Sequence, residues 1–217
     1  MSTATLLLIV ALLQQGFIAL AWLAATLGGL SRRAAAHWCA AAVCTGACLA
    51  LASLRGHVDP WIGFGLVNAL GVLSAVLIRR GGQVFIDRPG GDREHALVLG
   101  IVLLALLGLL TLGAQRSAVV FVTATGVAWC LLRGAFEQWQ RLRFELGLRP
   151  ATLVVVPIAL VGVVFTLRAL LAPLTPGLSV PLGAPGLADG VFGLFLLAST
   201  LLLHFSLGGM AVMRLVK

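Results

Sequence analysis

Charged residues are scarce in this sequence of 217 residues, where they make up only 10% of the chain. Hydrophobic residues make up 60%, the mean hydropathy is +1.09, and long apolar runs recur from one end to the other. A soluble domain of this length could not hide so many continuous apolar segments from water, so a soluble globular fold is excluded. The composition predicts an all-α, polytopic membrane protein whose helices form a bundle.

Acidic residues are scarcest at membrane depth. Apart from Glu94 and Asp189, which lie near predicted helix ends, the predicted spans contain none. This absence argues against a proton-coupled transporter or an intramembrane protease, because both need ionisable groups inside the membrane. The sequence also lacks H-E-x-x-H, G-x-S-x-G, P-loop and paired-carboxylate motifs. We therefore expect neither catalytic residues nor a cofactor within this chain.

The four cysteines lack the spacing of a metal or redox motif. Cys39, Cys44 and Cys48 share one predicted helix, and Cys130 lies in another. None of their intervals matches C-x-x-C. We expect small thiols that pack between helices, with a thiol or metal sensor as the alternative. The N-terminal segment likewise lacks the basic start and short apolar core of a signal peptide, so we expect it to remain as the first span.

Apolar runs of the length needed to cross a bilayer, about 20 residues, recur along the chain. The predicted spans are approximately 4 to 29, 35 to 54, 60 to 78, 95 to 114, 117 to 133, 151 to 172 and 188 to 212. The fifth is the weakest, because it is short and carries polar residues. It is still needed, since without it the basic segments on its two sides would lie on opposite faces of the membrane. The sequence therefore predicts one seven-transmembrane-helix domain.

Basic residues set the expected orientation. With the N-terminus outside, 12 of the 15 lysines and arginines lie on the inner side, and Arg55, Arg116 and Arg168 lie on the outer side. Because cytoplasmic loops carry such an excess of positive charge, the C-terminus is expected in the cytoplasm. Contact of these arginines with anionic lipid also explains the net charge of +8 and the pI of about 11.2. We expect membrane lipids as partners and no nucleic acid.

Three loops between the predicted spans need an interpretation. The string GGDRE, residues 90 to 94, matches part of the GGDEF signature of diguanylate cyclases, but it lies in a short loop between two spans. We interpret it as a turn and a helix start capped by Asp92. The string FEQWQRLRFELGLRP, residues 136 to 150, predicts a short interfacial helix. The segment 172 to 190 is rich in Pro and Gly and is expected to cap the outer mouth of the bundle.

Polar side chains at membrane depth are the candidate ligand-binding residues. We select Gln14, Gln15, Asn68, Thr200 and His204, together with Trp61 in the outer turn before Asn68. Their depth suggests an amphiphilic small molecule that enters from the outer side or from the bilayer. For Asn68 the alternative is a structural hydrogen bond between helices, worth about 0.6 to 2 kcal/mol.

Two histidines raise the question of haem. His37 and His204 both fall in the inner half of the predicted bundle. At a rise of 1.5 Å per residue, His204 lies roughly 12 Å deeper than His37. That offset suits two axial ligands of one haem poorly, so hydrogen-bonding roles are favoured and no metal site is predicted.

One part of the chain resembles a known family. Residues 51 to 89, LASLRGHVDPWIGFGLVNALGVLSAVLIRRGGQVFIDRP, follow two apolar segments joined through SRRAAAHW. This arrangement resembles the membrane-embedded sensor regions that precede GGDEF domains in many proteobacterial proteins. There, an outer LRG...P.W turn leads into a helix with an N.L...G pattern and then into an arginine-rich inner turn. The matching positions here are Leu54, Arg55, Gly56, Pro60, Trp61, Asn68, Leu70 and Gly71.

The resemblance implies a signal-sensing module of a bacterial inner membrane. Its last helix would pass the signal to a cytoplasmic output after residue 217, first of all a diguanylate cyclase that makes cyclic di-GMP. A homodimer is implied too, because two cyclase domains must meet around one product molecule. Two alternatives stay open: the sensor region of another receptor class, such as a histidine kinase, and a small transporter or channel with a polar path through the bundle.

Overall fold

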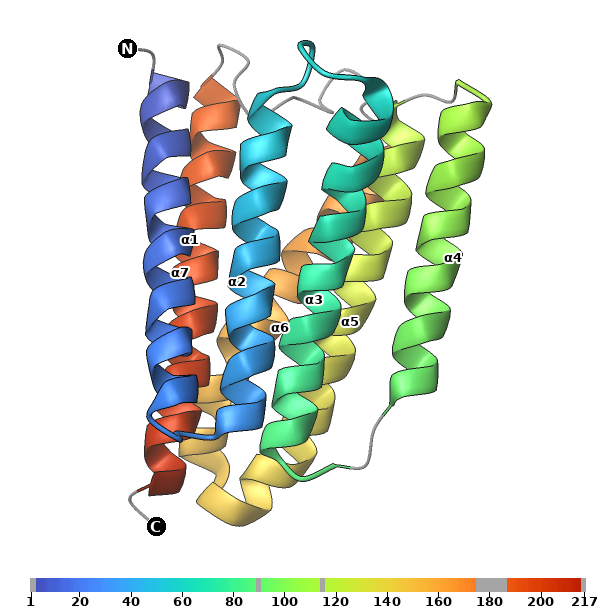
Figure 1. The fold of residues 1–217 in the computed structure, drawn as a ribbon. Helices are drawn as coiled ribbons and strands as arrows, with labels where there is room; N and C mark the ends of the chain where they lie inside the picture. The colour runs from blue at the N-terminus through green and yellow to red at the C-terminus, as the bar shows by residue number, and fades with distance from the viewer. Residues whose placement is uncertain (1–2, 89–90, 114–115, 175–186, 216–217) are drawn as a thin grey trace.

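The chain folds into a bundle of long antiparallel helices, in a computed structural model that describes residues 3–88, 91–113, 116–174 and 187–215 (Figure 1). The long helices are α1 (Thr3–Leu27), α2 (Arg32–Ser53), α3 (Val67–Phe85), α4 (Asp92–Thr111), α5 (Arg116–Leu146), α6 (Leu148–Leu171) and α7 (Leu187–Leu215). A π-helical segment, η1 (Trp61–Leu66), leads into α3. The described residues contain helices and turns but no β-strand, which confirms the all-α class.

The outer surface of the bundle is apolar. Phe17, Leu104 and Leu153, on three different helices, are each at least 70% exposed. Six helices, α1 to α6 with η1 counted into α3, are long and apolar enough to cross a membrane. The part of α7 whose side chains the structure describes, Leu197–Met213, is apolar but shorter. The structure is therefore that of a helical membrane bundle with six to seven spans, as the composition predicts.

Each helix runs opposite to the one before it, so the bundle has two ends. We call them the N-terminal end, where α1 and α5 begin, and the C-terminal end, where α3, α5 and α7 finish (Figure 1). Six helices form a closed ring in the order α1, α2, α3, α5, α6, α7, and α7 returns to α1. Helix α4 lies outside this ring, against α3 and α5. The first and last helices of the chain thus close the ring side by side.

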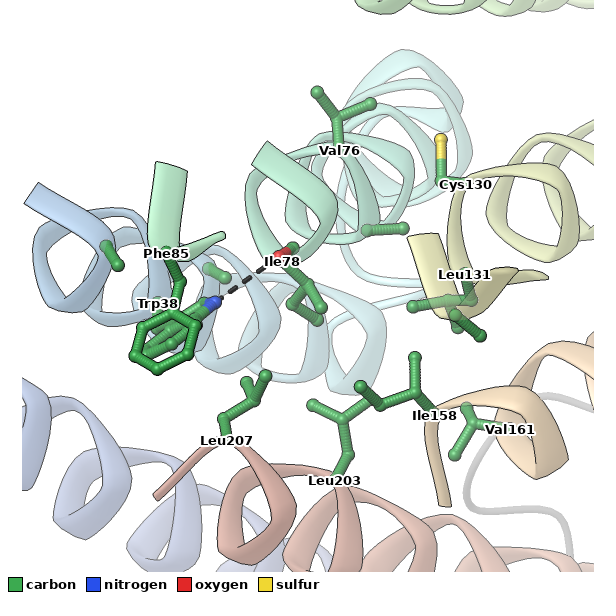
Figure 2. Packing of buried hydrophobic residues seen from close by; sticks show 14 of the residues in the cluster. Trp38, Val76, Ile78, Phe85, Cys130, Leu131, Ile158, Val161, Leu203 and Leu207 are labelled. Atoms are coloured by element: carbon green, nitrogen blue, oxygen red, sulfur yellow. Dashed lines mark hydrogen bonds between the residues drawn. The ribbon is translucent and has the colours of Figure 1, made fainter. Parts of the chain in front are cut away.

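One hydrophobic core fills the ring. Leu203 and Leu207 of α7 point to the same centre as Ile78 of α3 and Ile158 of α6 (Figure 2). Small residues bring the helices close together: a methyl group at Gly162 of α6 would lie 2.8 Å from the Leu132 side chain of α5. In a membrane, such close packing replaces the hydrophobic driving force that water supplies elsewhere.

Two helices extend beyond the spans predicted for them. The third predicted span ends at residue 78 and the fifth at 133, whereas the helix α3 continues to Phe85 and α5 continues without a break to Leu146. The predicted arginine-rich turn and the predicted separate interfacial helix are therefore parts of these long helices. Asp92 does not cap α4 as expected, because Gly91 holds the cap position. The expected outer cap, 172 to 190, lies largely outside the described residues.

Candidate functional site

A buried arginine, Arg79, joins three helices at the C-terminal end. It lies in α3 and is only 1% exposed. Its guanidinium donates two hydrogen bonds to the Glu94 carboxylate of α4, at 2.9 and 2.7 Å, and two to the Glu137 carboxylate of α5, at 2.7 and 3.3 Å. A guanidinium held by two carboxylates in this way has its charge and most of its donors satisfied. The helix α4, which lies outside the ring, is attached through this contact.

Glu137 is the second centre of the network. Its side chain is 2% exposed and accepts a hydrogen bond of 2.9 Å from the Gln83 amide. Arg133 and Arg88 approach the same carboxylate from its more exposed side, at 3.3 and 3.8 Å. A carboxylate taken out of water is costly unless it is paired and hydrogen-bonded, and here both conditions hold.

The glycines beside Arg79 make room for this arrangement. A Cβ at Gly81 would lie 2.6 Å from the indole Cδ1 of Trp38, and a Cβ at Gly82 would lie 3.0 Å from the amide carbon of Gln138. Both side chains therefore pack directly on the α3 backbone. The run RRGGQ, residues 79 to 83, thus supplies an ion-pair donor, two close helix contacts and an amide donor within one turn and a half.

Several buried polar atoms beside the network have no hydrogen-bond partner among the described residues. They are Gln83 Oε1, both amide atoms of Gln138 and His95 Nε2. Buried polar atoms of this kind are usually satisfied, often by ordered water. We expect water molecules at the C-terminal end of the bundle, next to the ion pairs.

A line of aromatic contacts runs from the last helix to this network. The Trp22 indole of α1 donates a 3.0 Å hydrogen bond to His204 Nδ1 of α7. The Trp22 and Trp38 rings lie 4.7 Å apart, and the Trp38 indole donates to the Ile78 carbonyl at 3.3 Å (Figure 2). Ile78 precedes Arg79 in α3. Four helices, α7, α1, α2 and α3, are thereby linked by adjoining buried side chains.

The predicted ligand-binding residues occupy two separate regions. Gln14 donates to the Leu197 carbonyl of α7 at 3.2 Å, Gln15 is buried with an unpartnered carbonyl oxygen, and His204 accepts from Trp22. These three, with the half-buried Thr200 of α7, lie along the joined helices α1 and α7. Trp61 lies 45% exposed in η1, at the N-terminal end. That these residues bind a ligand stays a prediction.

Asn68 has a local role in the structure. Its amide donates to the Phe64 carbonyl of its own helix at 2.6 Å. The π-helical turn of η1 shifts the backbone hydrogen bonds, with Val67 N donating to the Ile62 carbonyl. The Phe64 carbonyl also accepts from Val67 N, so the Asn68 amide is a second donor to a carbonyl at the point where the π turn passes into α3. It makes this bond within one helix and not to Gln14, Gln15 or His204.

The sequence analysis missed Glu137 and Gln138. It ends the fifth span at residue 133 and selects candidate polar residues only within the spans. A signal for them exists in the sequence. Small or apolar residues recur past residue 133 at helical spacing, at 135, 139 and 142. Arg133 lies four residues before Glu137, as expected of an ion pair on one helix face. No group of three or more His, Cys, Asp or Glu residues placed to hold a metal occurs in the described part of the chain.

A comparison of the chain with protein-family models, with curated proteins and with solved structures finds no match in any of the three.

Proposed function

We propose that the chain is the membrane-embedded sensing module of a bacterial signalling protein, with its N-terminus outside and its C-terminus in the cytoplasm. In this proposal α7 passes the signal to a cytoplasmic output, in the first instance a GGDEF diguanylate cyclase, and two copies act together. The observation that carries the proposal is the line of contacts from His204 of α7 through Trp22 and Trp38 to the Arg79 network.

The position of α7 supports this role. It closes the ring of helices between α1 and α6, and its described polar ties to α1 are the Gln14 and Trp22 hydrogen bonds. A rotation or a shift of α7 would break the Trp22–His204 bond. Since Trp22 packs on Trp38, the change would reach α3 directly beside Arg79. Coupling between distant sites is carried by adjoining packed side chains and ion pairs of this kind.

The distribution of charge supports the proposed orientation. The described ion pairs, all formed by residues 79 to 145, lie at the C-terminal end, where α7 finishes. Most arginines of the chain fall at this end, as the positive-inside rule requires of the cytoplasmic face.

A fusion protein tests the proposal. The chain is joined through α7 to a diguanylate cyclase domain, and cyclic di-GMP synthesis is measured in membrane vesicles. Trp22→Phe removes the indole donor and should change the cyclase rate about threefold to eighteenfold, the equivalent of an interhelical bond of about 0.6 to 1.7 kcal/mol. The control, Phe17→Leu, alters an outward-facing side chain of the same helix and should leave the rate unchanged.

Equal rates for the wild type and Trp22→Phe, at equal expression, would contradict transmission through this contact. The wild type and the same two variants are also fused to a histidine kinase domain, and kinase activity is measured. A change in the cyclase fusion alone indicates a sensor specific to cyclases, and a change in both indicates a general sensor.

A further inference from the structure

Two of the four cysteines lie one turn apart in α2, near the point where this helix finishes at the N-terminal end of the bundle. Cys44 and Cys48 are separated by four residues, so their Cβ atoms lie about 5 to 6 Å from each other on one helix face. Their sulfurs are close enough for two thiolate charges to repel each other. At a rise of 1.5 Å per residue, Cys48 lies roughly 8 Å from Ser53, the last residue of α2. Both cysteines are half-buried.

The other two cysteines have evident packing roles. Cys39 donates its thiol proton to the Ala19 carbonyl of α1, at 3.3 Å, and Cys130 is fully buried in the hydrophobic core. In contrast, neither Cys44 nor Cys48 makes a hydrogen bond in the part of the chain that the structure describes. The thiols of this pair are therefore available to a ligand.

There is space beside the Cys48 sulfur, because the residue that faces it from α3 is a glycine. A Cβ at Gly71 would lie 3.9 Å from Cys48 Sγ and, apart from its chain neighbours, would meet no other described side chain within 4 Å. At a metal–sulfur distance of about 2.3 Å, two sulfurs on opposite sides of an ion lie about 4.6 Å apart. Thiols on successive turns of one helix reach this separation by a change of side-chain rotamer, without movement of the backbone.

A positive charge lies near this pair. Arg55 follows Cys48 by seven residues, just after α2 ends, and its guanidinium is close enough to attract a thiolate at Cys48. Its Nε donates to the Gly63 carbonyl at 2.7 Å, which holds the guanidinium in place. A nearby arginine favours the thiolate form of cysteine, and the thiolate is the form that binds metal ions. Two thiolates and one monovalent cation together carry a single negative charge, which Arg55 would balance.

We propose that Cys44 and Cys48 form a two-coordinate binding site for a soft monovalent metal ion of the copper(I) type. Each thiol releases one proton when the ion binds, and Arg55 balances the charge that remains. Soft thiolate ligands select such ions over hard cations. Zinc does not suit the site, because structural zinc takes four ligands and no group of three or more His, Cys, Asp or Glu residues occurs among the described residues. The site does not depend on the proposed signalling role.

The test titrates the full chain in nanodiscs with copper(I), without oxygen and in competition with a chromogenic copper(I) chelator. We expect one bound ion per chain in the wild type. Cys44→Ser and Cys48→Ser should each bind more than about a hundredfold more weakly, since even partners outside the ligand shell account for about 10- to 100-fold. Cys39→Ser changes another half-buried cysteine of the same helix and should bind as the wild type does. Arg55→Gln should weaken binding about tenfold, and Arg55→Lys should recover part of it.

X-ray absorption by the ion bound to the wild type is a second measurement, which does not depend on how well a variant folds. Two sulfur ligands are expected, with no nitrogen or oxygen ligand. The proposed site does not exist if the wild type loses copper(I) to the chelator, if Cys44→Ser binds it as tightly as Cys39→Ser does, or if the ligands are nitrogen or oxygen. Equal affinities of Arg55→Gln and the wild type would overturn the role given to Arg55.

Discussion

Neutralising Glu137 should destabilise the bundle far more than neutralising any exposed acid of the same helix. The change Glu137→Gln keeps the shape of the side chain and removes its charge. Glu137 and Glu145 provide a matched pair, because each lies in α5 four residues after an arginine with which it forms an ion pair. Their surroundings differ: the Glu137 side chain is 2% exposed, and the Glu145 side chain is 31% exposed.

The expected cost follows from what would remain after the change. Arg79 is fully buried and would keep only Glu94, while Arg88 and Arg133 would face a neutral amide. Removing one partner of a buried ion pair costs about 3 to 5 kcal/mol. For a chain of this size, that loss corresponds to a fall in the unfolding midpoint of about 6 to 20 °C. The exposed Arg141–Glu145 pair is worth about 0.2 to 1 kcal/mol, so Glu145→Gln should shift the midpoint by less than about 4 °C.

Thermal unfolding in a mild detergent provides the measurement, with the folded fraction read by size-exclusion chromatography after heating. Labelling of Cys130 gives an independent signal, because its thiol is buried in the core and becomes accessible when α5 separates from its neighbours. Equal shifts for Glu137→Gln and Glu145→Gln would refute the reasoning, since the burial of the ion pair would then make no difference.

Three further substitutions test local features of the fold. Gly81→Ala should lower the free energy of unfolding by about 1 to 3 kcal/mol, because its Cβ would collide with the Trp38 indole. The control, Gly100→Ala, places a Cβ that meets nothing within 4 Å and should leave stability unchanged or slightly raised in the same unfolding assay. Asn68→Ala should cost no more than about 1 kcal/mol, because its bond lies within one helix; a larger loss would mean that Asn68 holds helices together. Gly56→Ala should cost about 1 to 3 kcal/mol, because the φ of 91° is strained for alanine, and an unchanged midpoint would contradict that strain.

The sequence was sufficient to predict the helices but not the network that joins them. Hydropathy locates apolar segments well, because a span must be apolar throughout. It fails at Arg79 and Glu137, which a hydropathy criterion assigns to loops although both lie buried in helices. Their charges cancel only after α3 and α5 have come together, and no local property of either segment reveals the partner. The same holds for the pairing of Trp22 with His204, which are 182 residues apart.

Asn68 shows the opposite error. As a single amide in an apolar run, it is expected to bond to a neighbouring helix, because an unsatisfied amide is costly in hydrocarbon. The Phe64 carbonyl, four residues earlier, supplies the partner within the same helix instead. Sequence reasoning identifies the need for a partner correctly, but the partner depends on backbone geometry that composition does not reveal.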